Sequence, residues 1–284
     1  MSRQLRHIIP AVSTSDGAGV KIKRSLGQSQ SARFDPVLML DEFNSDNASD
    51  YLAGFPSHPH RGFETVTYML DGHMLHEDHM GNRGDLRAGD VQWMTAGRGI
   101  IHSEMPQQIE GRMRGFQLWI NLPAAEKMKP AAYRDIAAAE IPVVSLADGG
   151  SVKVIAGELA HAQTTTRGAI AGLSTEPLYW DIELPAKRRV ELSLPEQHQV
   201  FVYLYEGDNL LVGEDLRQLQ VSQAGLLSSG DQLTLSAGDE AVRLLVIGGK
   251  PIGEPIAQYG PFVMNTAEEI EQAINDYRAG QLAG

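Results

Sequence analysis

Short runs of β-forming residues, cut at close intervals by turn signals, dominate this sequence. The separators are Gly-Asp, Asp-Gly and Gly-Gly pairs, which favour tight turns between neighbouring strands. Residues 65–70, for example, are rich in β-formers and end at Asp71-Gly72, a hairpin signal. Comparable runs occupy residues 91–94, 116–122, 200–205 and 242–247. The pattern predicts an all-β chain that folds into sandwiches or barrels.

The two halves of the chain echo each other faintly. Residues 68–72 have a counterpart at 203–207, and residues 89–94 have one at 230–235, in the same order. A length of 284 residues is comfortable for two domains. We therefore expect two copies of one β-barrel, over residues 1–134 and 140–284. The Ala-rich stretch 124–141 lies between them and is interpreted as a crossover.

One helix is predicted near the C-terminus. Thr266 and Glu269 have the spacing of a capping box, in which each side chain accepts from the backbone of the other residue. Gly280 is a plausible stop, because glycine commonly ends a helix. The apolar face at helical spacing would consist of Ile270, Ala273, Ile274 and Tyr277.

Composition excludes several classes of site. The chain has no cysteine, which excludes a disulfide scaffold, a thiolate zinc site, an iron–sulfur cluster and a thiol nucleophile. Any metal must therefore be held by imidazole and carboxylate groups. The formal net charge of -12 disfavours direct contact with nucleic acid. No apolar run approaches the ~20 residues of a membrane helix or forms a signal peptide, so we expect an acidic, cytoplasmic protein without a membrane partner.

Two histidines are separated by one residue in the segment His58-Pro59-His60. Residues two apart on a strand point to the same face, so both imidazoles can converge on one ion. Pro59 cannot donate to a strand ladder, which places the segment at an edge or rim. Taken alone, such a pair more often consists of two ordinary strand histidines than of metal ligands.

A second pair, His102 and Glu104, has the same spacing. Gly97 and Gly99 precede it and allow close approach of the backbone. Three imidazole nitrogens and one carboxylate oxygen suit Fe(II), Mn(II), Ni(II), Cu(II) or Zn(II). The spacing does not establish that the two pairs meet in space.

Three longer motifs resemble the pirin family of the cupin superfamily. They are HPHRGFETVTYMLDG at 58–72, GDVQWMTAGRGIIHSEMP at 89–106 and QYGPFVMNTAEEIEQAINDYRAGQ at 258–281. The resemblance extends over essentially the whole chain. It implies a bicupin fold, two cupin-type barrels that face each other with a short C-terminal helix, and a single iron ion in the N-terminal barrel. The ligands that it implies are His58, His60, His102 and Glu104.

Glu64 is an alternative carboxylate. Many cupins place a ligating Glu four residues after the second histidine, where this sequence has Glu64. The pirin pattern uses the later carboxylate, Glu104, which leaves Glu64 a supporting or strand role.

The second barrel is expected to hold no metal. The echoes between the halves map the candidate ligands onto positions that do not form a ligand set, namely Ser193, Pro195, Gln199, Arg243 and Leu245.

Further polar residues are weaker candidates. His73, His76 and His79 are three apart, which on a strand cannot place all three on one face, so we expect part-exposed or supporting roles. A hydrogen bond from His76 near the site stays open. Arg61 and Gln117 are pocket candidates by position alone.

The resemblance implies a non-haem iron dioxygenase that opens a flavonol such as quercetin with O₂, as in quercetin 2,3-dioxygenase. Glu104 would be both a ligand and the acceptor of the substrate hydroxyl proton. The alternative is a non-catalytic regulator whose metal or redox state controls binding to a transcription factor or a metabolic enzyme. A closed structural zinc site is a third hypothesis. The family also implies a monomer.

Overall fold

The computed structural model describes residues 1–29, 33–147 and 149–283, and they form two compact units. One unit contains Ala139–Pro251 with Met1–Val12 and Phe34–Pro36, and is called the 139–251 barrel. The other contains Val37–Ala138 with Ser13–Arg33 and Ile252–Gly284, and is called the 37–138 barrel. The units interleave along the sequence and so differ from the expected ranges 1–134 and 140–284 at both ends of the chain.

The 37–138 barrel consists of two antiparallel sheets. Its seven-stranded sheet has the order β12 (Ala132–Ile136), β9 (Val91–Thr95), β6 (Phe63–Asp71), β11 (Met113–Asn121), β4 (Val37–Ser45), β3 (Val20–Arg24) and β2 (Val12–Asp16). Its four-stranded sheet has the order β5 (Phe55–His60), β10 (Ile100–Pro106), β7 (His73–Asp78) and β8 (Arg83–Arg87). A short 3-10 helix, η1 (Ala48–Asp50), follows β4.

Apolar side chains of both sheets meet inside this barrel. Met69 of β6 and Met113 of β11, from the larger sheet, pack in one cluster with Met74 of β7 and Leu86 of β8, from the smaller one. Residues two apart share a face of a strand, so Thr67 of β6 points to the same interior as Met69. The sheets therefore close around one core and leave room for a few inward polar groups.

The 139–251 barrel repeats this layout. Its seven-stranded sheet has the order β1 (Leu5–Pro10), β22 (Gln223–Leu227), β19 (Gln199–Glu206), β24 (Val242–Gly249), β17 (Leu178–Leu184), β14 (Ser151–Ala156) and β13 (Val143–Ser145). Its four-stranded sheet has the order β18 (Arg189–Ser193), β23 (Gln232–Ala237), β20 (Asn209–Val212) and β21 (Arg217–Gln220). The hairpin of β15 (Glu158–His161) and β16 (Thr164–Arg167) is added to them.

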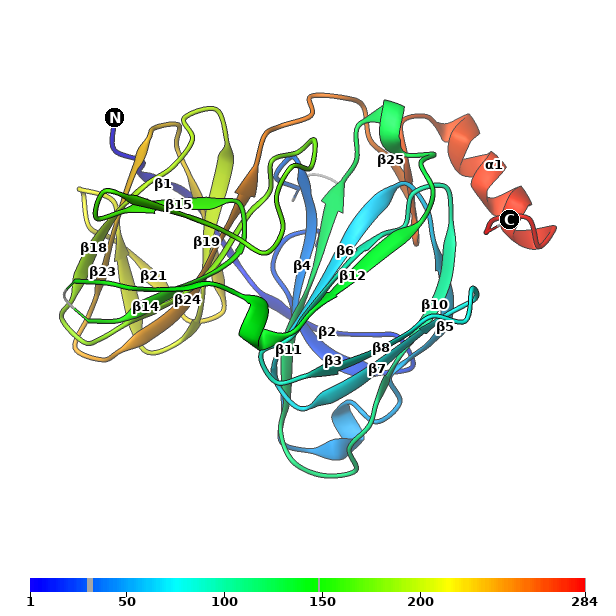
Figure 1. Cartoon of the computed structure of the whole chain (residues 1–284), viewed down its shortest axis with the longest axis horizontal. Coiled ribbons are helices and arrows are strands. Elements are labelled where there is room, and N and C mark those ends of the chain that lie inside the picture. The colour runs from blue at the N-terminus through cyan, green and yellow to red at the C-terminus, as the bar shows by residue number, and fades with distance from the viewer. Residues whose placement is uncertain (30–32, 148, 284) are drawn as a thin grey trace. The chain divides into compact units, whose positions relative to one another are not determined.

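The repeated layout confirms the prediction of two barrels of one kind. The edge strand β1 comes from the start of the chain, and Leu5 pairs with Leu227 of β22 (Figure 1). A contiguous apolar cluster, which includes Trp180 and Leu204, fills this barrel.

The stretch 124–141 does more than cross between barrels. It contains the 3-10 helices η2 (Ala124–Glu126) and η3 (Ala138–Glu140) and, between them, the strand β12. Ala132 pairs with Thr95 of β9, so β12 becomes the edge of the larger sheet of the 37–138 barrel. The Ala-rich composition of the stretch concealed this strand.

The C-terminal segment belongs to the 37–138 barrel. The hairpin of β25 (Ala257–Tyr259) and β26 (Phe262–Met264) precedes the helix α1 (Ala267–Arg278), red in Figure 1. Both bonds of the predicted capping box between Thr266 and Glu269 are present. Ile270 and Ala273 are buried against the hairpin, as the apolar periodicity predicted. Among the described helices, α1 included, none is long and apolar enough to cross a membrane.

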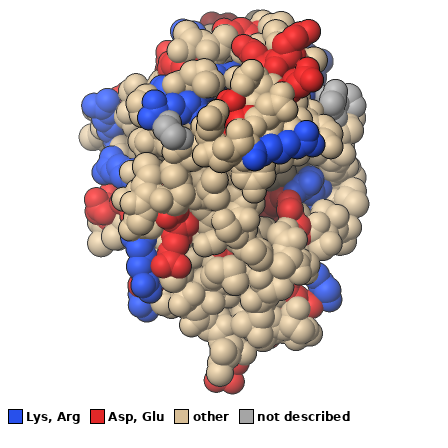
Figure 2. Space-filling view, turned by 90° about the vertical axis from the view of Figure 1, so that its right-hand side faces the viewer, with Lys and Arg blue, Asp and Glu red and all other residues tan. Residues whose placement is uncertain are grey.

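The side of the molecule that carries α1 is shown in Figure 2. Acidic side chains gather near the top of this view, whereas basic ones are scattered over it. This distribution is in keeping with the net charge of -12.

Candidate metal centre

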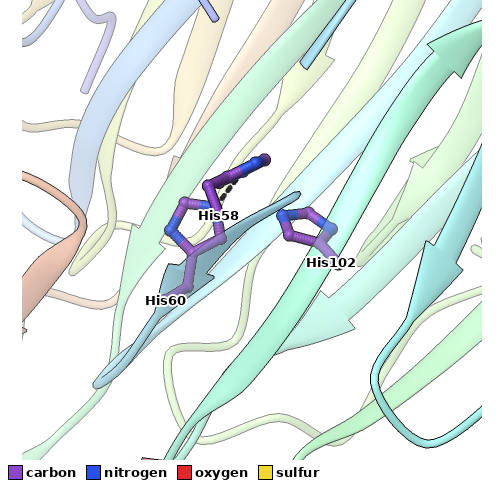
Figure 3. A group of neighbouring side chains, drawn as sticks. All are labelled: His58, His60 and His102. Carbon is purple, nitrogen blue, oxygen red and sulfur yellow. Dashed lines mark hydrogen bonds between the residues drawn. The ribbon is translucent and has the colours of Figure 1, made fainter. Parts of the chain in front are cut away.

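Three of the predicted ligands meet inside the 37–138 barrel. His58 and His60 lie on β5, and His102 lies on the neighbouring strand β10 directly opposite His58. The three imidazoles converge in Figure 3, and one ring nitrogen from each lies within 4.8 Å of the other two. The ring centroids are 4.7 Å apart for His58 and His60, 4.4 Å for His58 and His102, and 4.9 Å for His60 and His102. The two sequence motifs therefore form one site.

The nitrogens of this group fit a cation. His58 Nδ1 lies 2.8 Å from the carbonyl oxygen of Pro56, which it contacts as a hydrogen-bond donor, so the neutral ring presents a lone pair at Nε2. That Nε2 lies 3.0 Å from His60 Nε2. Two nitrogens bound to one ion at ~2.1 Å and at right angles would also lie ~3.0 Å apart. His102 Nε2 is buried and has no hydrogen-bond partner among the described residues, as expected of a ligand atom.

Burial favours the form of histidine that binds metals. Desolvation, and then the neighbouring imidazoles, hold the pKa of His60 and of His102 well below the ordinary value. Both side chains are almost fully buried, at 3% and 2% exposure. Neutral imidazole is the ligand form, and protonation would compete with the ion.

Glu104 lies on the same face of β10 as His102 and is held by two side chains of the larger sheet. Thr67 Oγ1 lies 2.8 Å from Glu104 Oε1, to which it donates, and Gln117 Nε2 donates to Glu104 Oε2 at 3.1 Å. The register shifts between His102 and Glu104 where β10 pairs with β5. Glu104 is 3% exposed, so these two bonds fix an otherwise desolvated carboxylate.

The residues that hold Glu104 belong to a polar row across the larger sheet. Thr67 of β6 lies directly opposite Gln117 of β11, and Gln117 lies opposite Asp41 of β4. Asp41 in turn pairs with Arg24 of β3. The predictions included Gln117 by position but missed Thr67, whose signal was a polar residue at an inward-facing position of a buried strand.

A cavity of about 740 Å³ opens onto this group. His58, His60, Glu104 and Gln117 line it, together with Asp41. All of its lining residues belong to the 37–138 barrel. Its apolar wall is formed by Ile22, Leu38, Met39, Phe43, Phe55 and Trp119. The size lies within the ~300–1,000 Å³ that is typical of small-molecule sites.

Glu64 and Arg61, two further candidates from the sequence, form hydrogen bonds with residues other than the three histidines. Glu64 accepts from Trp93 Nε1 at 3.1 Å and from Thr95 Oγ1 at 2.7 Å, so both of its oxygens are bonded within the sheet. Burial raises the pKa of Glu64. Arg61 does not line the cavity; its guanidinium pairs with Asp276 of α1 at 2.7 Å.

The remaining histidines divide as expected for a strand. His76 is fully buried, and its Nδ1 lies 3.3 Å from Nδ1 of His102, so it supports the ring of a candidate ligand. His73 pairs with Asp85 near the surface, and His79 is exposed. Only His76 of the three is therefore placed to influence the site.

Glycines permit the close approach that the sequence suggested. A Cβ on Gly97 would lie 2.2 Å from the carbonyl oxygen of Lys129, and one on Gly99 would lie 2.1 Å from that of Leu282. Both distances are far below a normal contact, so a side chain at either position would push the loop before His102 away from its neighbours.

The C-terminal segment braces the residues that follow His60. The Val263 amide of β26 donates to the Arg61 carbonyl at 3.0 Å. Lys127 Nζ donates to the carbonyl oxygens of Gly62 at 2.7 Å and Val263 at 3.0 Å, and to Asn121 Oδ1 at 2.6 Å. The residues that follow β5 are thus held by Val263 and Lys127, which lie far from them in sequence.

Comparison with known proteins assigns both halves of the chain. Residues 19–120 match the family model described as Pirin, and residues 179–283 match that described as Pirin C-terminal cupin domain. A protein of Pseudomonas aeruginosa that is named as a candidate quercetin 2,3-dioxygenase is 55% identical over 269 residues, which are 95% of this chain and 94% of that protein. A pirin-like protein of Caulobacter vibrioides is 46% identical over 279 residues, 98% of this chain and 99% of that protein.

A solved structure agrees over the whole chain. The crystal structure of quercetin 2,3-dioxygenase from Acinetobacter baumannii has a TM-score of 0.90 at 34% identity, and covers 100% of this chain and 99% of that one. The expected bicupin fold is confirmed by this likeness together with the two family matches.

Proposed function

The chain belongs to the pirin family, and from that premise we propose that it is a metal-dependent dioxygenase that opens a flavonol ring with O₂. One observation carries the proposal: three imidazoles converge on one point, and two of them, His58 and His60, line a cavity together with the fixed carboxylate of Glu104 and an apolar wall. The names of the Pseudomonas and Acinetobacter relatives support the substrate class, a flavonol such as quercetin.

We propose His58, His60, His102 and Glu104 as the ligands. The three nitrogens converge on one point, and the donor set suits Fe(II), our proposed ion, as well as Mn(II), Ni(II), Cu(II) and Zn(II). A divalent ion held there supplies Lewis acidity, which stabilises the ionised hydroxyl of the flavonol. Fewer protein ligands than an octahedral ion accepts would leave room for the substrate oxygens.

The protein groups supply orientation and proton transfer. Glu104 lines the cavity, so its carboxylate can accept the proton of the substrate hydroxyl. The bond from Thr67 and the bond from Gln117 hold both carboxylate oxygens in place before the substrate arrives. A base that is already oriented needs no rearrangement during the reaction.

The apolar wall suits a planar aromatic substrate. Phe55 and Trp119 offer aromatic surface, and Ile22, Met39 and Phe43 extend it. Water is displaced from this wall when a ring system binds, which contributes roughly 25 cal/mol per Å² of apolar surface covered. The apolar wall therefore contributes binding affinity, whereas the polar side of the cavity orients the substrate atoms that react.

Metal analysis and O₂ uptake with quercetin test the proposal. The protein loaded with Fe(II) should consume O₂ with quercetin, and His60→Ala should lose both the metal and the uptake. His73→Ala is the matched control, because His73 lies in the same barrel but is paired with Asp85 near its surface. Metal-replete protein that consumes no O₂ while a known quercetinase does so under the same conditions would refute the activity.

A further inference from the structure

Two arginines line the cavity, and they differ in their partners. Arg24 is neutralised, since its Nε and Nη2 donate to the two oxygens of Asp41 at 2.7 Å and 2.6 Å. The same Nη2 also donates to Asp16 at 2.8 Å. Two carboxylates thus surround one guanidinium, and this group has no charge to offer a ligand.

Arg33 is the contrasting case. Its guanidinium donates to the side-chain oxygen of Gln258, a neutral amide. Within the described part of the chain, Arg33 has no carboxylate at ion-pair distance, although it lines the cavity and is half-buried. Burial lowers the pKa of Arg33, which is the expected response of a cation that is partly removed from water and lacks a counter-ion.

Gln258 orients this guanidinium. It lies on β25, where it pairs with Val263 of β26, so its backbone is fixed by the hairpin. Its Nε2 donates to the Gly260 carbonyl at 3.4 Å, which leaves the amide oxygen for Arg33. Gln258 and Gly260 both line the cavity as well. A guanidinium has five donors, so one bond to an amide leaves several for a ligand.

We infer that Arg33 is a specificity-determining residue that binds an anionic substituent of the aromatic ligand in this cavity. The ligand class is therefore an aromatic compound that carries a carboxylate, a sulfonate or an ionised phenol in addition to its metal-binding oxygens. This inference rests on the proposed function only in that it takes the cavity over the metal centre as the ligand site. Carboxylates and sulfonates suit a guanidinium best, because two of their oxygens can accept parallel N–H···O bonds, whereas an ionised phenol offers one oxygen.

A pair of ligands that differ by one anionic substituent tests the inference. The probes are quercetin and quercetin-5′-sulfonate, titrated without O₂ into the metal-loaded protein, with binding followed by quenching of tryptophan fluorescence, because Trp119 lines the cavity. Arg33→Gln should weaken the sulfonate at least tenfold and quercetin less than threefold. Arg33→Lys should retain part of the preference, and added salt should weaken the sulfonate more than quercetin.

Arg188→Gln is the matched control, since Arg188 is an exposed arginine of the other barrel and should change neither affinity. Thermal melting of each variant verifies that it folds. Equal weakening of both probes by Arg33→Gln, or no weakening of either, would overturn the inference. Wild-type protein that binds neither probe would overturn it as well.

The outcome is separable from that of the proposed function. Charge-dependent binding without O₂ uptake would uphold the anion site and refute the dioxygenase. O₂ uptake by the wild type, together with an Arg33→Gln substitution that weakens both probes equally or neither, would do the reverse.

Discussion

Replacing Thr67 by valine tests whether Glu104, rather than Glu64, serves the metal. Valine keeps the shape of the side chain but removes the hydroxyl, which lies 2.8 Å from Glu104 Oε1 and 2.8 Å from Gln117 Oε1. The chain contains a matched control in Thr95→Val. Thr95 donates to the other buried carboxylate, Glu64, at 2.7 Å.

Both substitutions remove a hydrogen bond to a carboxylate that is at most 3% exposed. Each should therefore lower the free energy of unfolding of the metal-free protein by about 1–3 kcal/mol. Only Thr67→Val should also weaken metal binding, because Glu104 is proposed as a ligand and Glu64 is not. Loss of a side chain that orients a ligand typically weakens metal binding 10–100-fold, so we expect the Kd for the metal to rise by that factor.

The assay is competition between the protein and a chelator of known affinity at one fixed pH, with urea unfolding of the metal-free forms beside it. Thr95→Val should lose stability and keep the wild-type metal Kd within about twofold. If Thr67→Val bound the metal as tightly as the wild type, or Thr95→Val weakened it equally, the assignment of Glu104 would be wrong.

Three further outcomes are expected. Burial lowers the pKa of Lys127 from 10.5 to about 8, so between these values the unfolded chain binds a proton that the folded one lacks, and stability should rise with pH there. We expect the difference in unfolding free energy between the wild type and Lys127→Met to increase by up to about 3 kcal/mol as the pH rises from about 8 to 10.5. A difference, measured by urea unfolding, that does not vary with pH would contradict this. Asp276→Asn should lower the free energy of unfolding by about 1–3 kcal/mol, because the buried Arg61, 4% exposed, loses its counter-ion. The control is Asp239→Asn, at a site 92% exposed, which should have no measurable effect in the same denaturation experiment. Chelation should lower the melting temperature by a few degrees without unfolding the protein, since an ion at a hundredfold excess over its Kd stabilises by about 2.7 kcal/mol; His60→Ala should show no such shift, and complete unfolding on chelation would favour a structural zinc site instead.

The histidine site was predictable because strand geometry is periodic. The two-residue spacing required His58 and His60 to share a face, and the structure confirms that their Nε2 atoms meet at 3.0 Å. The meeting of this pair with His102 was not deducible from spacing, since it depends on the pairing of β5 with β10. The family resemblance supplied that step.

The support of Glu104 was beyond sequence reasoning for a similar reason. Thr67 and Gln117 lie on the larger sheet, and Glu104 lies on the smaller one, so their contact exists only after the barrel closes. Arg61 illustrates the opposite error. Its place beside His60 suggested a cavity residue, but the packing of α1 offered a carboxylate that a buried guanidinium requires.

Local signals likewise predicted strands and the helix cap but not long-range partners. The runs at 65–70 and 91–94 lie within β6 and β9. By contrast, β1 pairs with a strand more than two hundred residues away, and no turn signal specifies such a pairing. The short strand β12 was concealed because the stretch around it is rich in alanine, which has weak β-propensity.

The interleaving of the two units along the sequence also determines the order in which the parts of the 37–138 barrel are synthesised. The three histidines of the candidate metal site leave the ribosome early, but Val263 and Asp276, which brace the residue after His60, are made only after the whole of residues 139–251. Domains of most chains fold in the order of their synthesis. Here the nascent 37–138 barrel must remain without its brace while residues 139–251 are being made. Any continuous fragment that contains both the candidate metal site and its brace therefore also contains the whole of residues 139–251.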